Sequence, residues 1–257
     1  MKTTIIDSPT NPRVRSWTAL EDARERRASH LFLAEGLRVL KTAAEAGKKA
    51  VVLLVDREKF PDLPPGLPSA NEVCMLSSRA FGRVSSQTSP AGIAGVFELP
   101  SGPIQSLPGA PNSWRALVAW RIQDPGNLGA LVRVAAGAGF DAVLSVLPCA
   151  DFYSPKAVRG SSGFLFKVKT ATFDEAEFFA FAKANALVAV SAEASAPQDY
   201  RKFAWPPRFV LLLGGEAAGI PSEVSAQGPR VRIPMQNGCE SLNVSIAAGI
   251  LAFSSMP

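Results

Sequence analysis

Hydrophobic residues recur along the first hundred positions at spacings that predict a mixture of helices and strands. Helical periodicity covers residues 16–29 and 35–47, and the apolar run AVVLLVD at 50–56 predicts a short buried strand. Two further strands are predicted, at 72–77 (EVCMLS) and 92–99 (GIAGVFEL). We therefore expect residues 1–100 to form a small α/β domain.

The periodicity stops at a segment rich in Pro, Gly and Ser. PSGPIQSLPGAPNS, at 100–113, has little regular spacing of apolar residues, which is typical of a linker. We place the linker at 101–113. The chain is thus expected to divide into an N-terminal domain at 1–100 and a C-terminal domain at 114–257.

After the linker, predicted strands and helices alternate. Strands are predicted at 115–122, 141–147, 186–192, 208–215 and 230–235. Helices are predicted at 127–139, near 154–162, at 174–184, near 221–226 and from Val244 onward, and GFLFKVKT at 163–170 is a further apolar stretch. This alternation predicts an α/β fold with a mostly parallel sheet and helices on both faces. Ligands bind such sheets at the carboxyl ends of the strands, so the loops there are the candidates for chemistry.

The composition indicates the cellular location of the protein and argues against membrane, disulfide and metal-binding functions. The longest apolar runs, RFVLLLGG and SIAAGILAF, are too short to cross a bilayer, and the N-terminus lacks the long apolar stretch of a signal peptide. We therefore expect a cytoplasmic protein with no membrane partner. Cys74, Cys149 and Cys239 are isolated and form no CxxC pair, which argues against a disulfide framework and against a bound metal.

The distribution of charge along the chain indicates a nucleic-acid partner only weakly. A net charge of +5 is compatible with a nucleic-acid partner but does not establish one. Residues 1–50 hold ten Lys and Arg against six Asp and Glu, and the helical spacing of EDARERRASHLFLAEGLRVLK fits a solvated helix face and an RNA-facing helix equally well. The single histidine, His30, lies in this stretch, which argues against a His-based triad. Any chemistry must use carboxylates, hydroxyls, amides, Arg or Lys.

The first unusual loop follows the strand at 115–122. In RIQDPGNLGALVRVAAGAGF, Pro125 and Gly126 end the strand and Asn127 is a good N-cap for the helix that follows. Arg133 is the one charged side chain in that helix. A planar guanidinium suits bidentate binding of a phosphate, although an exposed Arg that points at solvent fits the pattern as well.

Two more loops stand at strand ends. LLLGGEAAGIP, at 211–221, places Gly214 and Gly215 directly after a strand, where a ligand can approach the backbone and where a plain turn is the simpler explanation. QNGCESLNVSIAAGILAF, at 236–253, leads into the last helix through Ser241 and Asn243, which are typical capping residues. No GxGxxG follows a strand and no P-loop is present, which argues against a dinucleotide or P-loop nucleotide site.

In this order, the three loops closely resemble a known family. DPGNLGALVRVAAGAGF, LLLGGEAAGIP and IPMQNGCESLNVSIAAGILAF are similar to the three motifs of the SpoU (TrmH-like) RNA 2′-O-ribose methyltransferases of the SPOUT superfamily. SPKAVRGSSGFLFKV, at 154–168, resembles the segment between the first two motifs. SPTNPRVRSWTAL, FLAEGLRVL and SPAGIAGVFE resemble the N-terminal substrate-binding domain of many members, so the resemblance covers nearly the whole chain.

The resemblance implies both a fold and an activity. The C-terminal domain is expected to contain a deep trefoil knot, preceded by a small α/β (L30e-like) N-terminal domain, and the chain is expected to form a homodimer. The implied cofactor is S-adenosylmethionine, bound in the knot. The implied reaction is methyl transfer to a ribose 2′-OH in structured RNA, with 23S rRNA as the first choice and tRNA as the second.

The resemblance also implies roles for individual residues. The expected catalytic residues are Asn127, Arg133, Glu216, Ser241 and Asn243, and the expected cofactor contacts are Gly214, Ile233 and Leu242. RNA contacts are expected at Asn11, Arg13, Arg38, Arg159 and Ser161. For Arg159 and Ser161, a surface Arg and a helix-ending Ser remain open as alternatives.

Two other functions compete with this interpretation. A catalytically inactive RNA-binding ribosome-assembly factor would keep the same fold, although the presence of all five polar motif residues argues against loss of catalysis. A nucleotide-dependent oxidoreductase lacks its sequence fingerprint.

Overall fold

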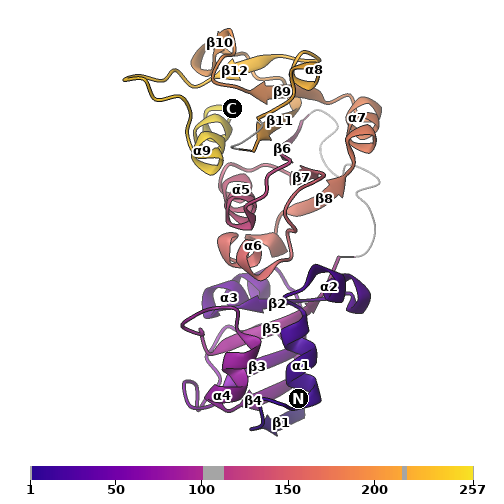
Figure 1. Ribbon diagram of the computed structural model, residues 1–257, viewed down its shortest axis with the longest axis vertical. Helices are drawn as coiled ribbons and strands as arrows, with labels where there is room; N and C mark the ends of the chain where they lie inside the picture. The colour runs from indigo at the N-terminus through magenta and orange to yellow at the C-terminus, as the bar shows by residue number, and fades with distance from the viewer. Residues whose placement is uncertain (1, 101–112, 216–218, 257) are drawn as a thin grey trace. The chain divides into compact units, whose positions relative to one another are not determined.

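The computed structural model describes residues 2–100, 113–215 and 219–256. The chain forms two compact units, one with residues 2–100 and Asp151–Lys167, the other with 113–150 and the described residues after Lys167. Each unit has its own sheet (Figure 1). The expected division at 101–113 falls almost entirely outside the described residues and stays a prediction.

The first unit is built on a mixed five-stranded sheet with the order β1-β4-β3-β5-β2. Its strands are β1 (Lys2–Ile6), β2 (Leu31–Glu35), β3 (Ala50–Asp56), β4 (Ala70–Leu76) and β5 (Ile93–Glu98). β1, β4 and β3 run parallel, and β5 pairs antiparallel with both β3 and β2. One face of this sheet packs on Val14, Trp17, Phe81 and Val84 from two helices, which forms the core of the unit.

The helix predicted at 16–29 is two helices, so the single-helix prediction is wrong. The helices of the unit are α1 (Pro12–Ala19), α2 (Ala23–Ser29), α3 (Leu37–Glu45), α4 (Ser78–Val84) and α6 (Pro155–Gly160). Asp22 lies in extended backbone and accepts hydrogen bonds from the N–H groups of Arg24 and Glu25, which begins a new helix. The apolar periodicity continues across this cap, which is why the pattern did not reveal the break.

Residues 151–167 belong to the first unit through specific contacts. Arg26 is 2% exposed, and its guanidinium Nε donates to Asp151 Oδ2 at 3.1 Å. Thr42 Oγ1 donates to the carbonyl of Ser162 at 3.2 Å, and Lys167 Nζ donates to Glu45 Oε2 at 2.7 Å. The apolar stretch predicted at 163–170 forms a 3-10 turn (Phe164–Phe166) followed by β8 (Lys169–Phe173) of the other unit.

A network centred on Glu72 ties β4 to α1 and β1, and its pKa gives a testable prediction. Arg13 donates to both carboxylate oxygens at 3.0 and 2.8 Å, and Thr4 Oγ1 donates to Oε1 at 2.6 Å. These bonds, those from Arg13 above all, lower the pKa of Glu72 from 4.5 to about 2. A lowered pKa stabilises the fold above the ordinary value, and the stabilisation is lost as the pH falls toward the lowered one.

Glu72→Gln is therefore expected to lower the melting temperature near neutral pH. Between pH 4.5 and about 2 the difference from the wild type is expected to shrink, because the wild type then loses the same interaction by protonation. Thermal unfolding followed across this range checks the prediction. A difference that stays constant with pH would contradict it.

The second unit contains a parallel seven-stranded sheet with the order β10-β12-β9-β11-β6-β7-β8. Its other strands are β6 (Trp114–Trp120), β7 (Ala142–Val146), β9 (Val188–Ala192), β10 (Gln198–Asp199), β11 (Arg208–Gly214) and β12 (Arg230–Arg232). Every strand pair of this sheet among the described residues is parallel. The prediction of an α/β fold with a mostly parallel sheet is confirmed.

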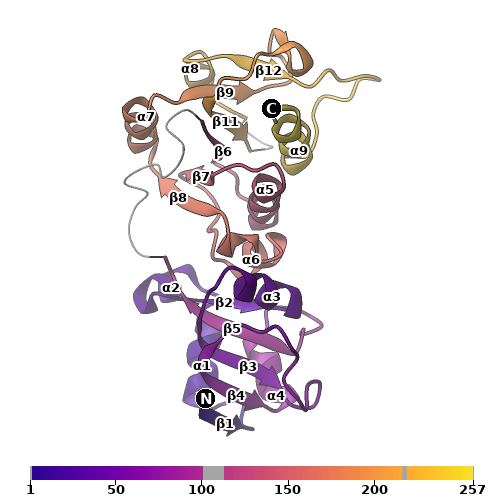
Figure 2. The same cartoon turned by 180° about the vertical axis from the view of Figure 1, so that it is seen from behind.

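Helices cover both faces of this sheet. They are α5 (Pro125–Gly137), α7 (Glu175–Ala184), α8 (Ser222–Ser225) and α9 (Val244–Ser254). Alternate β6 residues, from Trp114 to Trp120, pack on one face with Phe178 of α7 and Val224 of α8. α5 and α9 lie together on the opposite side of the sheet, as both views of the ribbon show (Figures 1 and 2).

Candidate functional site

The strands β9, β11 and β12 end beside one another, and a cavity of about 490 Å³ opens at their carboxyl ends. Gly214 ends β11, Ile233 follows β12, and Leu242 precedes α9. All three predicted cofactor contacts line this cavity, together with Ser241 of the predicted catalytic set. The structure thus brings together residues from two of the three sequence motifs.

Close backbone packing favours glycine at Gly214, the last residue of β11, and at Gly215, which follows it. A Cβ atom on Gly214 would lie 2.4 Å from the carbonyl carbon of Gly219, and one on Gly215 would lie 3.0 Å from the carbonyl oxygen of Arg121. Gly219 itself has a φ of +60°, which glycine adopts without strain. The Gly-Gly pair therefore allows the backbones of Gly219 and Arg121 to pack directly against the end of β11. Glu216, the predicted catalytic carboxylate, lies outside the described residues.

Asn127 does not cap α5, so that prediction is wrong. The helix begins at Pro125, whose missing N–H and fixed φ suit a first helical position, and Asp124 Oδ1 accepts the hydrogen bond from the Asn127 N–H at 2.9 Å. The Asn127 side chain is used differently, because its Oδ1 accepts a hydrogen bond from Asn243 Nδ2 at 3.1 Å. This bond joins the first and third motifs.

Asn243 is the cap of α9, as the capping explanation expects. Its Oδ1 accepts hydrogen bonds from the Ser245 N–H at 2.9 Å and from Ser245 Oγ at 2.6 Å. The amide nitrogen of the same side chain faces Asn127, so one residue holds the helix and the loop contact at once. Ser241 is exposed and lies two residues before the cap, at the edge of the cavity.

Arg133 lies on α5, about 9 Å along the helix axis from Asn127 at 1.5 Å per residue. The side chain is exposed, and no hydrogen bond or ion pair involves it among the described residues. An unengaged guanidinium on the helix that carries Asn127 is available to bind a phosphate or a developing negative charge.

The residues expected to contact RNA differ in their availability. Arg38 is exposed in the first turn of α3, and Asn11 caps α1 by accepting from the Arg13 N–H. Arg13 is held by Glu72, and Arg159 donates to Ser86 Oγ at 2.7 Å. Ser161 is 0% exposed and bonds to the carbonyl of Val158 at the end of α6, so the structure favours the helix-ending alternative for its side chain.

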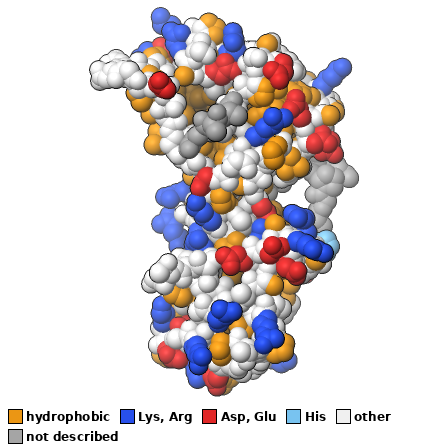
Figure 3. Space-filling model, in the orientation of Figure 1, with side chains coloured by type: hydrophobic (Ala, Val, Ile, Leu, Met, Phe, Trp, Pro, Cys, Tyr) orange, Lys and Arg blue, Asp and Glu red, His pale blue; other side chains and the backbone are white. Residues whose placement is uncertain are grey.

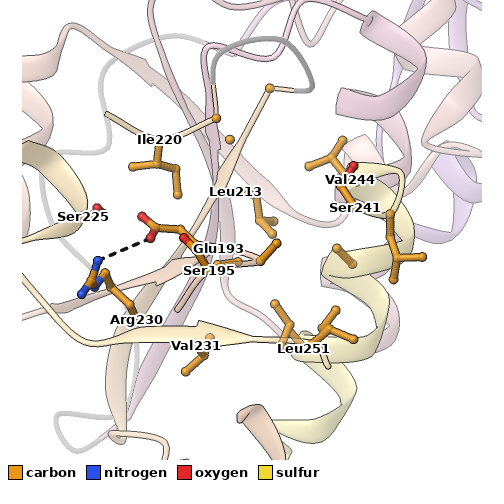
Figure 4. Close-up of a pocket in the computed structure, with 18 of the residues that line it drawn as sticks. Glu193, Ser195, Leu213, Ile220, Ser225, Arg230, Val231, Ser241, Val244 and Leu251 are labelled. Atoms are coloured by element: carbon orange, nitrogen blue, oxygen red, sulfur yellow. Dashed lines mark ion pairs between the residues drawn. The ribbon is translucent and has the colours of Figure 1, made fainter. Parts of the chain in front are cut away.

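Sequence reasoning missed two charged residues of the cavity. Glu193 directly follows β9, and Arg230 begins β12, with 3.8 Å between Glu193 Oε2 and Arg230 Nη1 (Figure 4). The rule that ligands bind at the carboxyl ends of parallel strands applies to β9 as well, and would have pointed to Glu193. Among the described residues, no group of three or more His, Cys, Asp or Glu side chains is arranged to hold a metal ion, and no helix is long and apolar enough to cross a membrane.

Both halves of the chain match described families. Residues 115–253 match the SpoU rRNA Methylase family, and residues 11–95 match the MRM3-like substrate binding domain. The chain is 28% identical over 251 residues to the 23S rRNA (guanosine(2553)-2′-O)-methyltransferase RlmP of Bacillus subtilis. That match covers 96% of this chain and 97% of the relative.

Two further relatives agree with these matches. The 23S rRNA (uridine(2479)-2′-O)-methyltransferase of Streptomyces viridochromogenes is 26% identical, over 96% of this chain and 90% of its own length. The structure of the AdoMet-bound rRNA methyltransferase from Sinorhizobium meliloti superimposes with a TM-score of 0.85 at 27% identity, covering 98% of this chain and 97% of the other.

Proposed function

The chain belongs to the SpoU rRNA methylase family, and from this premise we propose that it transfers a methyl group from S-adenosylmethionine to a ribose 2′-OH in ribosomal RNA. The observation that carries the proposal is the cavity at the ends of β9, β11 and β12, with the Asn127–Asn243 pair on the first and third motifs. Its volume is in the range of small-molecule sites.

The residues of the cavity fit this cofactor. Ile233, Leu242 and Leu251 offer an apolar wall for the adenine, and the Gly214 backbone permits close approach. When bound, S-adenosylmethionine supplies an electrophilic methyl group on a sulfonium. Glu216 is retained as a proposed catalytic residue from the motif resemblance alone.

The protein must then hold the ribose and favour loss of its hydroxyl proton. We assign Arg133 to binding the adjacent phosphate and to stabilising the developing alkoxide by charge. A guanidinium carries five N–H donors and no acceptor, which makes it a poor base, so electrostatic stabilisation is the role we favour. Asn127, Ser241 and Asn243 are proposed to position the ribose, with the Asn127–Asn243 bond fixing the two loops against each other.

Transfer of labelled methyl from S-adenosylmethionine to RNA tests the proposed substrate. With 23S rRNA and tRNA offered separately, incorporation is expected into the rRNA. Incorporation into tRNA alone would show that tRNA, and not rRNA, is the substrate. Cofactor binding without transfer to any cellular RNA would favour the inactive assembly factor of the same fold.

We propose that the first unit supplies much of the RNA affinity. On the face that Figure 3 shows, Lys and Arg side chains are spread over this unit with acidic side chains between them. Arg38→Ala is expected to weaken RNA binding several-fold and to reduce the slope of log affinity against log salt by about 0.7–0.9, the contribution of one phosphate contact. Binding titrations at several salt concentrations measure the slope, with Lys183→Ala on α7 as a control for loss of one exposed charge. An unchanged slope would remove Arg38 from the RNA contacts.

The finer features of the fold are also proposals. The family relationship supports a deep trefoil knot in the second unit and an L30e-like fold for the first, which a crystal structure traced through residues 216–218 would test. The proposed homodimer is supported by exposed apolar side chains on and after α9, Ile246, Phe253 and Met256. A monomer mass in sedimentation equilibrium would contradict it. The expected cytoplasmic location stays a prediction that cell fractionation would check.

A further inference from the structure

Glu193 occupies a fixed position in the cavity, between two strand ends. It directly follows β9, and its backbone N–H donates to the carbonyl of Val231 in β12 at 3.0 Å. Its own carbonyl accepts from the Ala196 N–H at 3.2 Å, which closes a short turn. The backbone therefore holds this side chain at the level where Gly214 ends β11.

The Glu193 carboxylate is largely buried and incompletely satisfied. The side chain is 16% exposed, and Oε1 is buried without a hydrogen-bond partner among the described residues. Oε2 lies 3.8 Å from Arg230 Nη1, on a side chain that is 42% exposed. Figure 4 shows the carboxylate projecting into the cavity, on the side where Ile220, Ser225 and Arg230 lie.

A buried carboxylate oxygen that accepts no hydrogen bond destabilises the folded protein. The site is therefore complementary to a ligand that supplies a hydrogen-bond donor. Arg230 already places a positive charge beside Oε2, so Oε1 requires a neutral hydrogen-bond donor more than a second cation. The nearby apolar side chains Leu213 and Val231 offer no such donor. The hydroxyls of Ser195, Ser222 and Ser225 also line the cavity, but among the described residues none of them donates to Oε1. This oxygen is therefore open to a donor from a ligand or from water.

We propose that Glu193 is a cofactor-recognition residue whose carboxylate accepts hydrogen bonds from the two ribose hydroxyls of S-adenosylmethionine. Vicinal hydroxyls present two donors side by side, which match the two oxygens of one carboxylate. With the adenine against Ile233 and Leu242, the ribose is the adjoining part of the cofactor that carries neutral donors. This assignment rests on the proposed function, since it presumes that S-adenosylmethionine occupies the cavity.

Calorimetric binding of S-adenosylhomocysteine and its 2′-deoxy and 3′-deoxy analogues tests the assignment. For the wild type, removal of either hydroxyl is expected to weaken binding about tenfold or more, as for loss of a hydrogen bond to a charged group. In Glu193→Ala, the parent and the deoxy analogues are expected to bind within about twofold of one another, because the partner of the hydroxyls is gone. Equal weakening by the deoxy change in wild type and variant would overturn the assignment.

A second ligand distinguishes the ribose from the amino-acid end of the cofactor. Methylthioadenosine keeps both ribose hydroxyls but lacks the α-ammonium group. Glu193→Ala is expected to weaken its binding by the same factor as that of S-adenosylhomocysteine. No weakening would assign Glu193 to the ammonium and overturn the proposal.

Two variants control for charge and folding. Glu223→Gln removes an exposed carboxylate on α8 that does not line the cavity. It is expected to leave the affinity of each deoxy analogue relative to S-adenosylhomocysteine unchanged. If the alanine variant is unstable, the isosteric Glu193→Gln is used for the same comparison. In that variant too, removing a ribose hydroxyl from the ligand is expected to weaken binding less than it does in the wild type. A wild type that does not bind S-adenosylhomocysteine at all would contradict the proposed function itself, and the role of Glu193 with it.

Discussion

Replacement of Arg133 by alanine is expected to reduce the methyl-transfer turnover by at least about two orders of magnitude. This is the loss that follows removal of one preorganised group that stabilises charge in a transition state. The structure makes the test clean because no hydrogen bond or ion pair within the described residues involves this exposed side chain. The melting temperature and the affinity for S-adenosylhomocysteine are therefore expected to stay near the wild-type values.

Single-turnover kinetics with saturating RNA separate chemistry from binding in this variant. Lys183→Ala, on α7 of the same unit, removes one exposed positive charge and serves as the matched control, with turnover expected to be unchanged. Near-normal turnover in Arg133→Ala would remove Arg133 from the catalytic residues.

Replacement of Asn243 by aspartate is expected to abolish most activity while the fold stays stable. The carboxylate keeps the acceptor that bonds the Ser245 N–H, and a negative charge at a helix N-terminus is favourable. The same change removes the Nδ2 donor to Asn127 Oδ1 and places a negative charge beside the proposed ribose phosphate. Capping alone predicts an active enzyme, so activity and stability should separate in this variant.

Melting curves and turnover measured on the same preparation decide between the two roles of Asn243. Asn237→Asp changes an exposed residue of the same loop that forms no hydrogen bond with Asn127 among the described residues. It adds an equal charge and is expected to keep its activity. An active Asn243→Asp enzyme would reduce this residue to a helix cap.

The alternation of strands and helices after residue 113 was readable from the sequence because each buried strand is a short continuous apolar run. The first unit was harder to predict. β1 is a five-residue edge strand whose pairing with β4 joins residues about seventy positions apart, and β2 lies inside a stretch whose charges repeat at helical spacing. Local patterns carry no information on such distant pairing.

The candidate site was predicted in part. The motif resemblance identified Gly214, Ile233 and Leu242, which line one cavity in the structure. Glu193 was not predicted as a site residue because it belongs to none of the three motifs, and a single Glu after a strand looks like an ordinary surface residue. Its significance depends on burial and on an unsatisfied oxygen, which are properties of the folded chain.

The central claim is that a ribose 2′-oxygen of ribosomal RNA accepts the methyl group, and one measurement identifies the accepting atom. The protein, S-adenosylmethionine carrying a labelled methyl group and unmodified 23S rRNA are incubated together, and the RNA is then digested completely to nucleosides for mass spectrometry. We predict that the label is found in one 2′-O-methylnucleoside, and that Arg133→Ala forms at least about a hundredfold less of it in the same time. Label on a base, or no transfer to RNA by a protein that binds the cofactor, would contradict the account.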